Sequence, residues 1–284
     1  MSKRKGWLFT AGSLVFAAAA HAAPFAMVTE LKGDAATMDG GKPRKVTLLG
    51  YIESPTELRV EPTARVGVTY FASGVQYSFS GPGRVVLEAS APKVLEGKPA
   101  IAQKVGPEKA IGGGGLSNDQ WRRLQQATVV MRTVKPAFSI VGPDKTAVLA
   151  AEPEFEWTAA ADARRYRVVV YGPQNQILHE ATTDQTVFRP GAAVRLEPGQ
   201  QYRWKVDAIG VAKPVSTSGS FTVASDAARK RFAASRPQDG AEPPARMFYA
   251  TTLEAEGHTH DARAVWKALA RQYPDVAEFR QRSQ

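Results

Sequence analysis

Short runs of alternating apolar residues recur along most of this chain and limit it to a mainly β fold. In the first third, such runs cover residues 46–49, 58–60, 66–70, 75–79 and 85–87. A period of two places every second side chain on the same face of a strand. Turn residues separate the runs at 40–41, 73–74 and 81–83, and the chain holds 24 glycines and 19 prolines. This pattern is typical of an all-β sandwich or roll.

A second set of alternating strands lies in residues 135–223. The string Leu-x-Pro-Gly-x-x-Tyr-x-Trp-x-Val-x-Ala at 196–208 resembles the penultimate strand of fibronectin type III domains. The resemblance implies an immunoglobulin-like β-sandwich in which Tyr202 forms a tyrosine corner, its hydroxyl bonded to the upstream turn. The aromatic residues expected in the core of this sandwich are Trp157, Tyr166, Tyr202 and Trp204.

The first region, residues 24–104, has its own family resemblance. Its motifs are Val-Thr-Glu-Leu-Lys-Gly-Asp at 28–34, Val-Thr-Leu-Leu-Gly at 46–50 and Glu-Pro-Thr-Ala-Arg-Val-Gly-Val-Thr-Tyr at 61–70, followed by 70–77 and Gly-Pro-Gly at 81–83. Together they resemble the FecR-like domain of bacterial envelope proteins. The resemblance implies a β-roll or sandwich that serves as a periplasmic sensor or interaction module. We do not expect anti-sigma signalling, because the cytoplasmic and transmembrane helices of the iron-transport regulator are not seen here.

The first 22 residues read as an export signal. Lys3, Arg4 and Lys5 precede an uncharged apolar stretch at 7–20, and Ala20-His21-Ala22 follows. This order of basic, apolar and small residues predicts a signal peptide over 1–22. An uncleaved anchor is the alternative, but the stretch is shorter than the roughly 20 residues that cross a bilayer. We therefore expect a periplasmic or otherwise exported mature chain with no membrane span.

Residues 105–134 are expected to form a glycine-rich linker and a helix. The four glycines at 112–115 are not followed by the lysine and hydroxyl residue that a phosphate loop needs. Ser117 and Gln120 then stand at the spacing of a capping box, which predicts a helix that carries Trp121 and Leu124.

The tail, residues 226–284, is expected to be helical. Helices are predicted from Asp226 to Ala234, from 241 to 256 with Gly257 as the stop, and from 259 to 273 before Pro274. The last two resemble a tetratricopeptide-like helix pair. Such a unit cannot bury its own apolar face, so it must pack on the sandwich, on another copy or on a partner. The side chains predicted to dock a partner are Phe248, Leu253, Trp266 and Leu269.

The residues required by the common catalytic sites are scarce. The sequence has no cysteine and, beyond the signal, only three histidines, so thiolate nucleophiles, disulfides and cysteine zinc sites are excluded. His258 and His260, two residues apart, do not share a helix face, and we expect solvent exposure or helix capping rather than metal binding. Glu152, Glu154 and Glu156 would lie on one strand face rather than on opposing walls. No enzyme activity, metal or cofactor is expected.

Recognition is the remaining class of function. We expect a non-catalytic periplasmic binding or scaffold protein, with a sensory or regulatory role left open, that docks an envelope protein partner. The alternative is a binder of an anionic envelope polymer, peptidoglycan or polysaccharide, because removal of the signal lowers the formal charge only from +10 to +7. Nucleic acid is not an expected partner, since the scattered basic residues form no aromatic and basic groove pattern.

Overall fold

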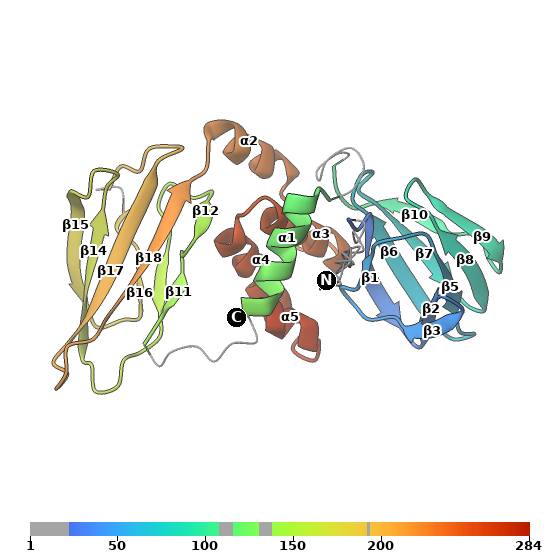
Figure 1. The fold of residues 1–284 in the computed structure, drawn as a ribbon, viewed down its shortest axis with the longest axis horizontal. Coiled ribbons are helices and arrows are strands. Elements are labelled where there is room, and N and C mark those ends of the chain that lie inside the picture. The colour runs from blue at the N-terminus through green and yellow to red at the C-terminus, as the bar shows by residue number, and fades with distance from the viewer. Residues whose placement is uncertain (1–22, 108–115, 131–137, 192–193) are drawn as a thin grey trace, which may run out of the picture.

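The computed structural model describes residues 23–107, 116–130, 138–191 and 194–284. The expected signal peptide (1–22) and the glycine run at 112–115 lie outside the described residues. Two β-rich parts lie at opposite ends of the molecule with helices between them (Figure 1). The fold is mainly β with small C-terminal helices, which confirms the expected fold class.

Two facing sheets form the N-terminal part. One has the strand order β10-β7-β6-β1-β4 and the other β3-β2-β5-β8-β9, with antiparallel pairing throughout. The strands are β1 (Ala26–Lys32), β2 (Ala35–Asp39), β3 (Lys42–Lys45), β4 (Tyr51–Ile52), β5 (Thr56–Val60), β6 (Arg65–Tyr70), β7 (Val75–Ser80), β8 (Gly83–Leu87), β9 (Pro92–Glu96) and β10 (Ile101–Lys104). Apolar side chains of both sheets share one core, as the alternating pattern predicts; among them are Val28, Leu58, Val66, Val68 and Val85. This part is therefore a β-sandwich.

The second sandwich combines a three-stranded and a five-stranded sheet. Their orders are β11-β13-β16 and β12-β18-β17-β14-β15, and β12 runs parallel to β18. The strands are β11 (Ile140–Gly142), β12 (Thr146–Val148), β13 (Phe155–Trp157), β14 (Arg165–Tyr171), β15 (Ile177–Thr183), β16 (Val187–Phe188), β17 (Gln201–Ile209) and β18 (Ser216–Val223). Splitting successive strands between two sheets in this way gives an immunoglobulin-like, fibronectin type III-like sandwich.

The four core aromatics expected from the sequence lie inside this sandwich. Trp157, Tyr166, Tyr202 and Trp204 are each at most 3% exposed. The Tyr202 hydroxyl accepts a hydrogen bond of 2.6 Å from the backbone N–H of Glu197, which is the geometry of a tyrosine corner. Trp204 Nε1 donates to the carbonyl oxygen of Pro143 at 2.8 Å. These two bonds give the Tyr202 hydroxyl and the Trp204 Nε1–H a partner, so both side chains are buried without an unpaired polar group.

Five helices form a block between the sandwiches in the described part of the chain. They are α1 (Asn118–Val130), α2 (Asp226–Ser235), α3 (Pro243–Ala255), α4 (Thr259–Gln272) and α5 (Ala277–Arg282). The predicted capping box forms at α1, where Gln120 N–H donates to Ser117 Oγ at 3.2 Å and Ser117 N–H donates to Gln120 Oε1 at 2.8 Å. Gly257, predicted as a helix stop, has a φ of 86° between α3 and α4. Among the described residues no helix is long and apolar enough to cross a bilayer.

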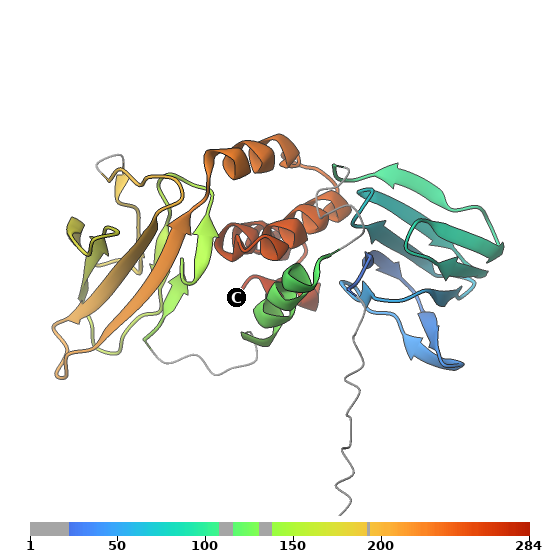
Figure 2. The ribbon, with the colours of Figure 1, turned by 45° about the horizontal axis from the view of Figure 1, so that its top comes forward.

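Figure 2 shows how this helical block (α1–α5) connects the two ends of the molecule. The α3–α4 hairpin runs from one sandwich to the other, with α1 and α2 on different sides of it. The block draws on two distant stretches of sequence, because α1 precedes the second sandwich and α2 to α5 follow it. The C-terminal helices are therefore an internal part of the fold rather than a free tail.

Candidate binding groove

The four side chains expected to dock a partner are buried inside the chain itself. Phe248, Leu253, Trp266 and Leu269 are each at most 1% exposed. They share one apolar cluster with Met27, Leu49, Phe71 and Leu124, which come from the first sandwich, the chain near it and α1. The structure therefore places Phe248, Trp266 and Leu269 inside the fold, because the helix pair packs its apolar face against its own chain, while Leu253 also reaches the lining of the groove described below.

The contacts between α3 and the first sandwich are specific. The rings of Phe71 and Phe248 stack with centroids 6.4 Å apart. Thr251, fully buried, lies with its Oγ1 3.7 Å from Met27 Sδ. On the neighbouring side of α3, Gln120 and Arg123 of α1 bond to Glu256 and to the carbonyl of Ala255. The first sandwich and α1 thus occupy the surface of α3 that a further repeat or a partner would otherwise cover.

A buried ion pair ties the C-terminus to the same region. Arg282 Nη1 lies 2.6 Å from Glu254 Oε2, and both residues are less than 10% exposed. Trp266 Nε1 donates to the other oxygen of Glu254 at 2.8 Å, and Arg282 Nη2 donates to the hydroxyl of Tyr51 at 3.3 Å. This network joins α3, α4 and α5 to β4.

The second sandwich bonds to the N-terminal end of α4. The carbonyl of Gly257 accepts hydrogen bonds of 3.0 Å from both Ala147 N–H and Thr146 Oγ1. Leu149 N–H donates to Asp261 Oδ2 at 3.0 Å, and Lys267 pairs with Glu156 at 2.6 Å. The helical block is therefore held by polar contacts on this side and by an apolar cluster on the other.

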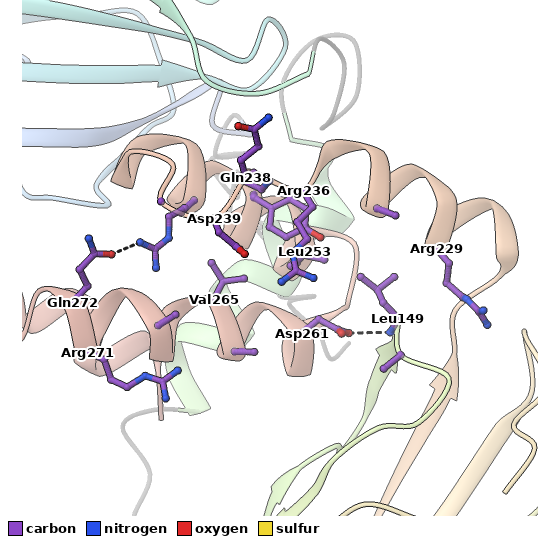
Figure 3. A pocket seen from close by; sticks show the side chains of 18 residues that line it. Leu149, Arg229, Arg236, Gln238, Asp239, Leu253, Asp261, Val265, Arg271 and Gln272 are labelled. Carbon is purple, nitrogen blue, oxygen red and sulfur yellow. Dashed lines mark hydrogen bonds between the residues drawn. The ribbon is translucent and has the colours of Figure 1, made fainter. Parts of the chain in front are cut away.

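One face of the block remains open and forms a groove. It lies between α2, the segment that follows α2, and the seam of α3 and α4, and it has a volume of about 890 Å³. In Figure 3, Arg236 and Asp239 come from the segment after α2, whereas Asp261, Val265 and Arg271 come from α4. Leu149 and Ala150 of the second sandwich close one end. A groove of this size can hold a few side chains of another molecule.

The groove has an apolar floor and a basic rim. Ala264, Val265 and Ala268 supply accessible apolar surface next to the buried Tyr249 and Leu253. The arginines of the lining are Arg229, Arg236, Arg246 and Arg271. Its carboxylates are Asp239 and Asp261. Asp261 is already bonded to the backbone of Leu149, so the lining favours a negatively charged occupant.

Burial at the edge of the groove shifts the pKa of three neighbouring groups. It raises the pKa of Asp261 to about 6, against the effect of the backbone N–H groups that bond to the carboxylate. Burial also lowers the pKa of His260 to about 4, helped by the nearby charge of Arg263. Burial lowers the pKa of His258 as well. All three groups lie where α4 meets the second sandwich.

Three of the histidines and glutamates singled out in the sequence, His258, Glu154 and Glu156, make contacts within the fold. His258 is 4% exposed, with Nδ1 3.1 Å from the carbonyl oxygen of Ala147, so the expectation of solvent exposure is wrong for this residue. Glu154 pairs with Arg189 and Glu156 with Lys267. No group of three or more metal-ligating side chains occurs among the described residues.

Of the groove residues, Leu253 alone was among the side chains predicted from the sequence to dock a partner. Arg246, Tyr249 and Leu253 stand at helical spacing along α3, which is a signal that they share one face. The contribution of Arg236 and Asp239 depends on where the segment after α2 folds, and no local pattern encodes that. The helical spacing of apolar residues on α3 and α4 was the stronger sequence signal, and most of those residues lie in the buried core rather than in the groove.

The chain combines an N-terminal β-sandwich, a fibronectin type III-like sandwich and a helical block with a groove. No family model matches it, and no curated protein gives a significant match. A two-domain fibronectin type III segment from chicken tenascin aligns with 71% of this chain and 94% of its own length, at 12% identity and a TM-score of 0.24. The BSP domain of a biofilm associated protein aligns over 72% of this chain and 25% of its own, at 12% identity and a TM-score of 0.22.

Proposed function

We propose that this chain is a non-catalytic, exported scaffold protein of the cell envelope that holds a protein partner in the groove of its helical block. The groove is the observation that carries the proposal. Accessible apolar side chains lie there beside Arg236 and Arg271, two exposed arginines without an ion-pair partner among the described residues, and such a mixture is typical of protein recognition sites.

The sequence supports the location and the modular plan. The basic, apolar and small residues of positions 1–22 favour export. The FecR-like motifs of the first sandwich and the tetratricopeptide-like helix pair are resemblances to modules that bind rather than catalyse. In this proposal the two sandwiches fix the orientation of the helical block, and the block presents the groove.

Crosslinking inside cells tests the proposal. A photoreactive amino acid at Ala264, an exposed residue of the groove, should capture one defined protein from the envelope. The same amino acid at Ala161, an exposed residue of the second sandwich, is the matched control and should capture none. Absence of any specific product at Ala264 would contradict the proposal.

The same experiment separates the alternative of an anionic polymer. Four arginines in the groove lining would also attract a polyanion. Cell-wall polymer that crosslinks equally to Ala264 and Ala161 would favour broad basic attraction over a docked protein.

A further inference from the structure

The charges of the groove are incompletely neutralised by the chain itself. Arg236 and Arg271 are both exposed, and the part of the chain that the structure describes gives neither of them an ion-pair partner. Arg246 bonds to the neutral amide of Gln272. Arg229 lies 3.8 Å from the carboxylate of Asp226. Guanidinium groups of this kind bind carboxylates in a bidentate geometry, so they are suited to acidic side chains.

The apolar lining of the groove favours an occupant that carries apolar side chains as well as negative charge. Ala264 is exposed, and Leu149, Val265 and Ala268 are half-buried, so these residues give the groove its accessible apolar surface. An occupant made only of hydrated anionic groups would leave this apolar surface without a matching contact. An occupant that carries apolar side chains between carboxylates would use both parts of the groove.

A second copy of this chain fits the groove poorly. The chain carries 37 lysines and arginines against 27 aspartates and glutamates. Two such molecules repel each other over long range, and the approach of a basic surface to four arginines adds to that repulsion.

We propose that the groove binds an acidic segment of a partner protein, whose carboxylates pair with Arg236 and Arg271 and whose apolar side chains contact Ala264, Val265 and Ala268. This inference rests on the proposed function and names the chemistry of the partner. The segment would also touch Leu149 and Ala150, so one occupant contacts the helical block and the second sandwich together.

A synthetic peptide tests the chemistry directly on the full mature chain. The probe is a fluorescein-labelled peptide of twelve residues that repeats Glu-Glu-Leu-Leu, and its control replaces each Glu by Gln. Fluorescence anisotropy should show binding of the acidic peptide and at least about tenfold weaker binding of the neutral one. Equal binding of the two peptides, or no binding of either, would overturn the inference.

Charge reversals locate the binding. The double variant Arg236→Glu/Arg271→Glu should weaken binding of the acidic peptide about tenfold or more, since two attractive contacts become repulsive. The matched control Arg164→Glu/Lys213→Glu changes net charge equally at exposed residues of the second sandwich and should alter binding less than about twofold. Equal losses in the two variants would show general attraction by a basic protein and would overturn the assignment to the groove.

Two further readouts distinguish other occupants. Val265→Ser should weaken binding of the peptide but not binding of polygalacturonate, a soluble acidic polysaccharide. If polygalacturonate displaces the peptide at similar affinity, the groove binds a polymer and the inference is overturned. Light scattering should find the chain monomeric, and a dimer disrupted by Arg236→Glu would favour a second copy. If the photoreactive residue at position 264 captures a protein in cells but Arg236→Glu/Arg271→Glu does not change peptide binding, the proposed function is supported. The inference that the partner segment is acidic is then overturned.

Discussion

Glu254 and Arg282 form an ion pair that is almost fully withdrawn from water. Burial raises the pKa of Glu254, although the Arg282 charge and the Trp266 N–H act in the opposite direction. A buried pair of this kind adds little net stability over an apolar replacement, but removal of one partner leaves a charge without compensation. The pair therefore matters most for where α5 is held.

The first prediction concerns this pair. Arg282→Met should lower the free energy of unfolding by about 3–5 kcal/mol, because Glu254 loses its counter-charge. The double variant Glu254→Gln/Arg282→Met should recover part of the loss, because the Gln carbonyl still accepts from Trp266 Nε1. Urea denaturation measures both. Arg280→Met, at an exposed residue of the same helix, should cost less than about 1 kcal/mol, and an equal loss in Arg280→Met and Arg282→Met would contradict the account.

Two neighbouring groups at the start of α4, His260 and Asp261, make the stability of the chain depend on pH. The pKa of His260 in the folded chain, about 4, is below the value of about 6.5 expected when unfolded. The unfolded state therefore takes up the proton first, and stability falls as pH drops from about 6.5 to 4. For Asp261 the folded pKa of about 6 exceeds the unfolded value of about 4, so stability rises as pH drops from about 6 to 4. The two effects, each of about 3 kcal/mol, largely cancel.

Asp261→Asn removes the stabilisation at low pH that comes from the raised pKa of Asp261, and leaves the opposite effect of His260. The amide oxygen can still accept from Leu149 N–H, but the side chain no longer titrates. The free energy of unfolding of the variant should fall by about 3 kcal/mol more than that of the original chain between pH 6.5 and 4. Denaturation curves at several pH values measure this, with Asp239→Asn, an exposed groove residue, as the control. Parallel pH profiles for Asp261→Asn and the original chain would contradict the assignment.

At the scale of elements, Gly106 marks where the first sandwich meets α3. A Cβ added to Gly106 would collide with the ring of Phe248. Gly106→Ala should therefore cost about 1–3 kcal/mol through overpacking. Phe248→Leu in the same chain should make the Gly106→Ala change less costly, and a double-mutant cycle measures the coupling. Additive losses would mean that the two elements do not pack as described.

The elements themselves were largely predictable from local sequence. Alternation at 155–157 and 201–209 predicted β13 and β17, and Ser117 with Gln120 predicted the start of α1. The FecR-like and tetratricopeptide-like resemblances stay predictions. The helix α5 was not predicted, because six residues give too little periodicity. The partners of Phe248 and Trp266 could not be predicted either, since Met27 and Phe71 lie more than a hundred residues away and only the tertiary fold brings them together.

At the scale of the whole molecule, the helical block joins two sandwiches that the chain builds separately. Met27, Leu49 and Phe71 belong to one buried cluster with side chains of α1, α3 and α4. A chain that ends at Val223 would expose these side chains. We predict that this truncated chain binds the dye ANS strongly and elutes as aggregates in size-exclusion chromatography. A monomeric truncated chain without ANS binding would show that the first sandwich does not need the helical block.

The central claim is that the groove of the helical block, with its exposed arginines, is the binding site of this protein. The most direct test is the crosslinking yield from Ala264 in cells, compared between the original chain, Arg236→Glu/Arg271→Glu and Arg164→Glu/Lys213→Glu. The account predicts that one defined protein is captured by the original chain and by the second variant, and that capture by the first variant falls to background. Equal capture by all three chains, or none by any, would contradict it.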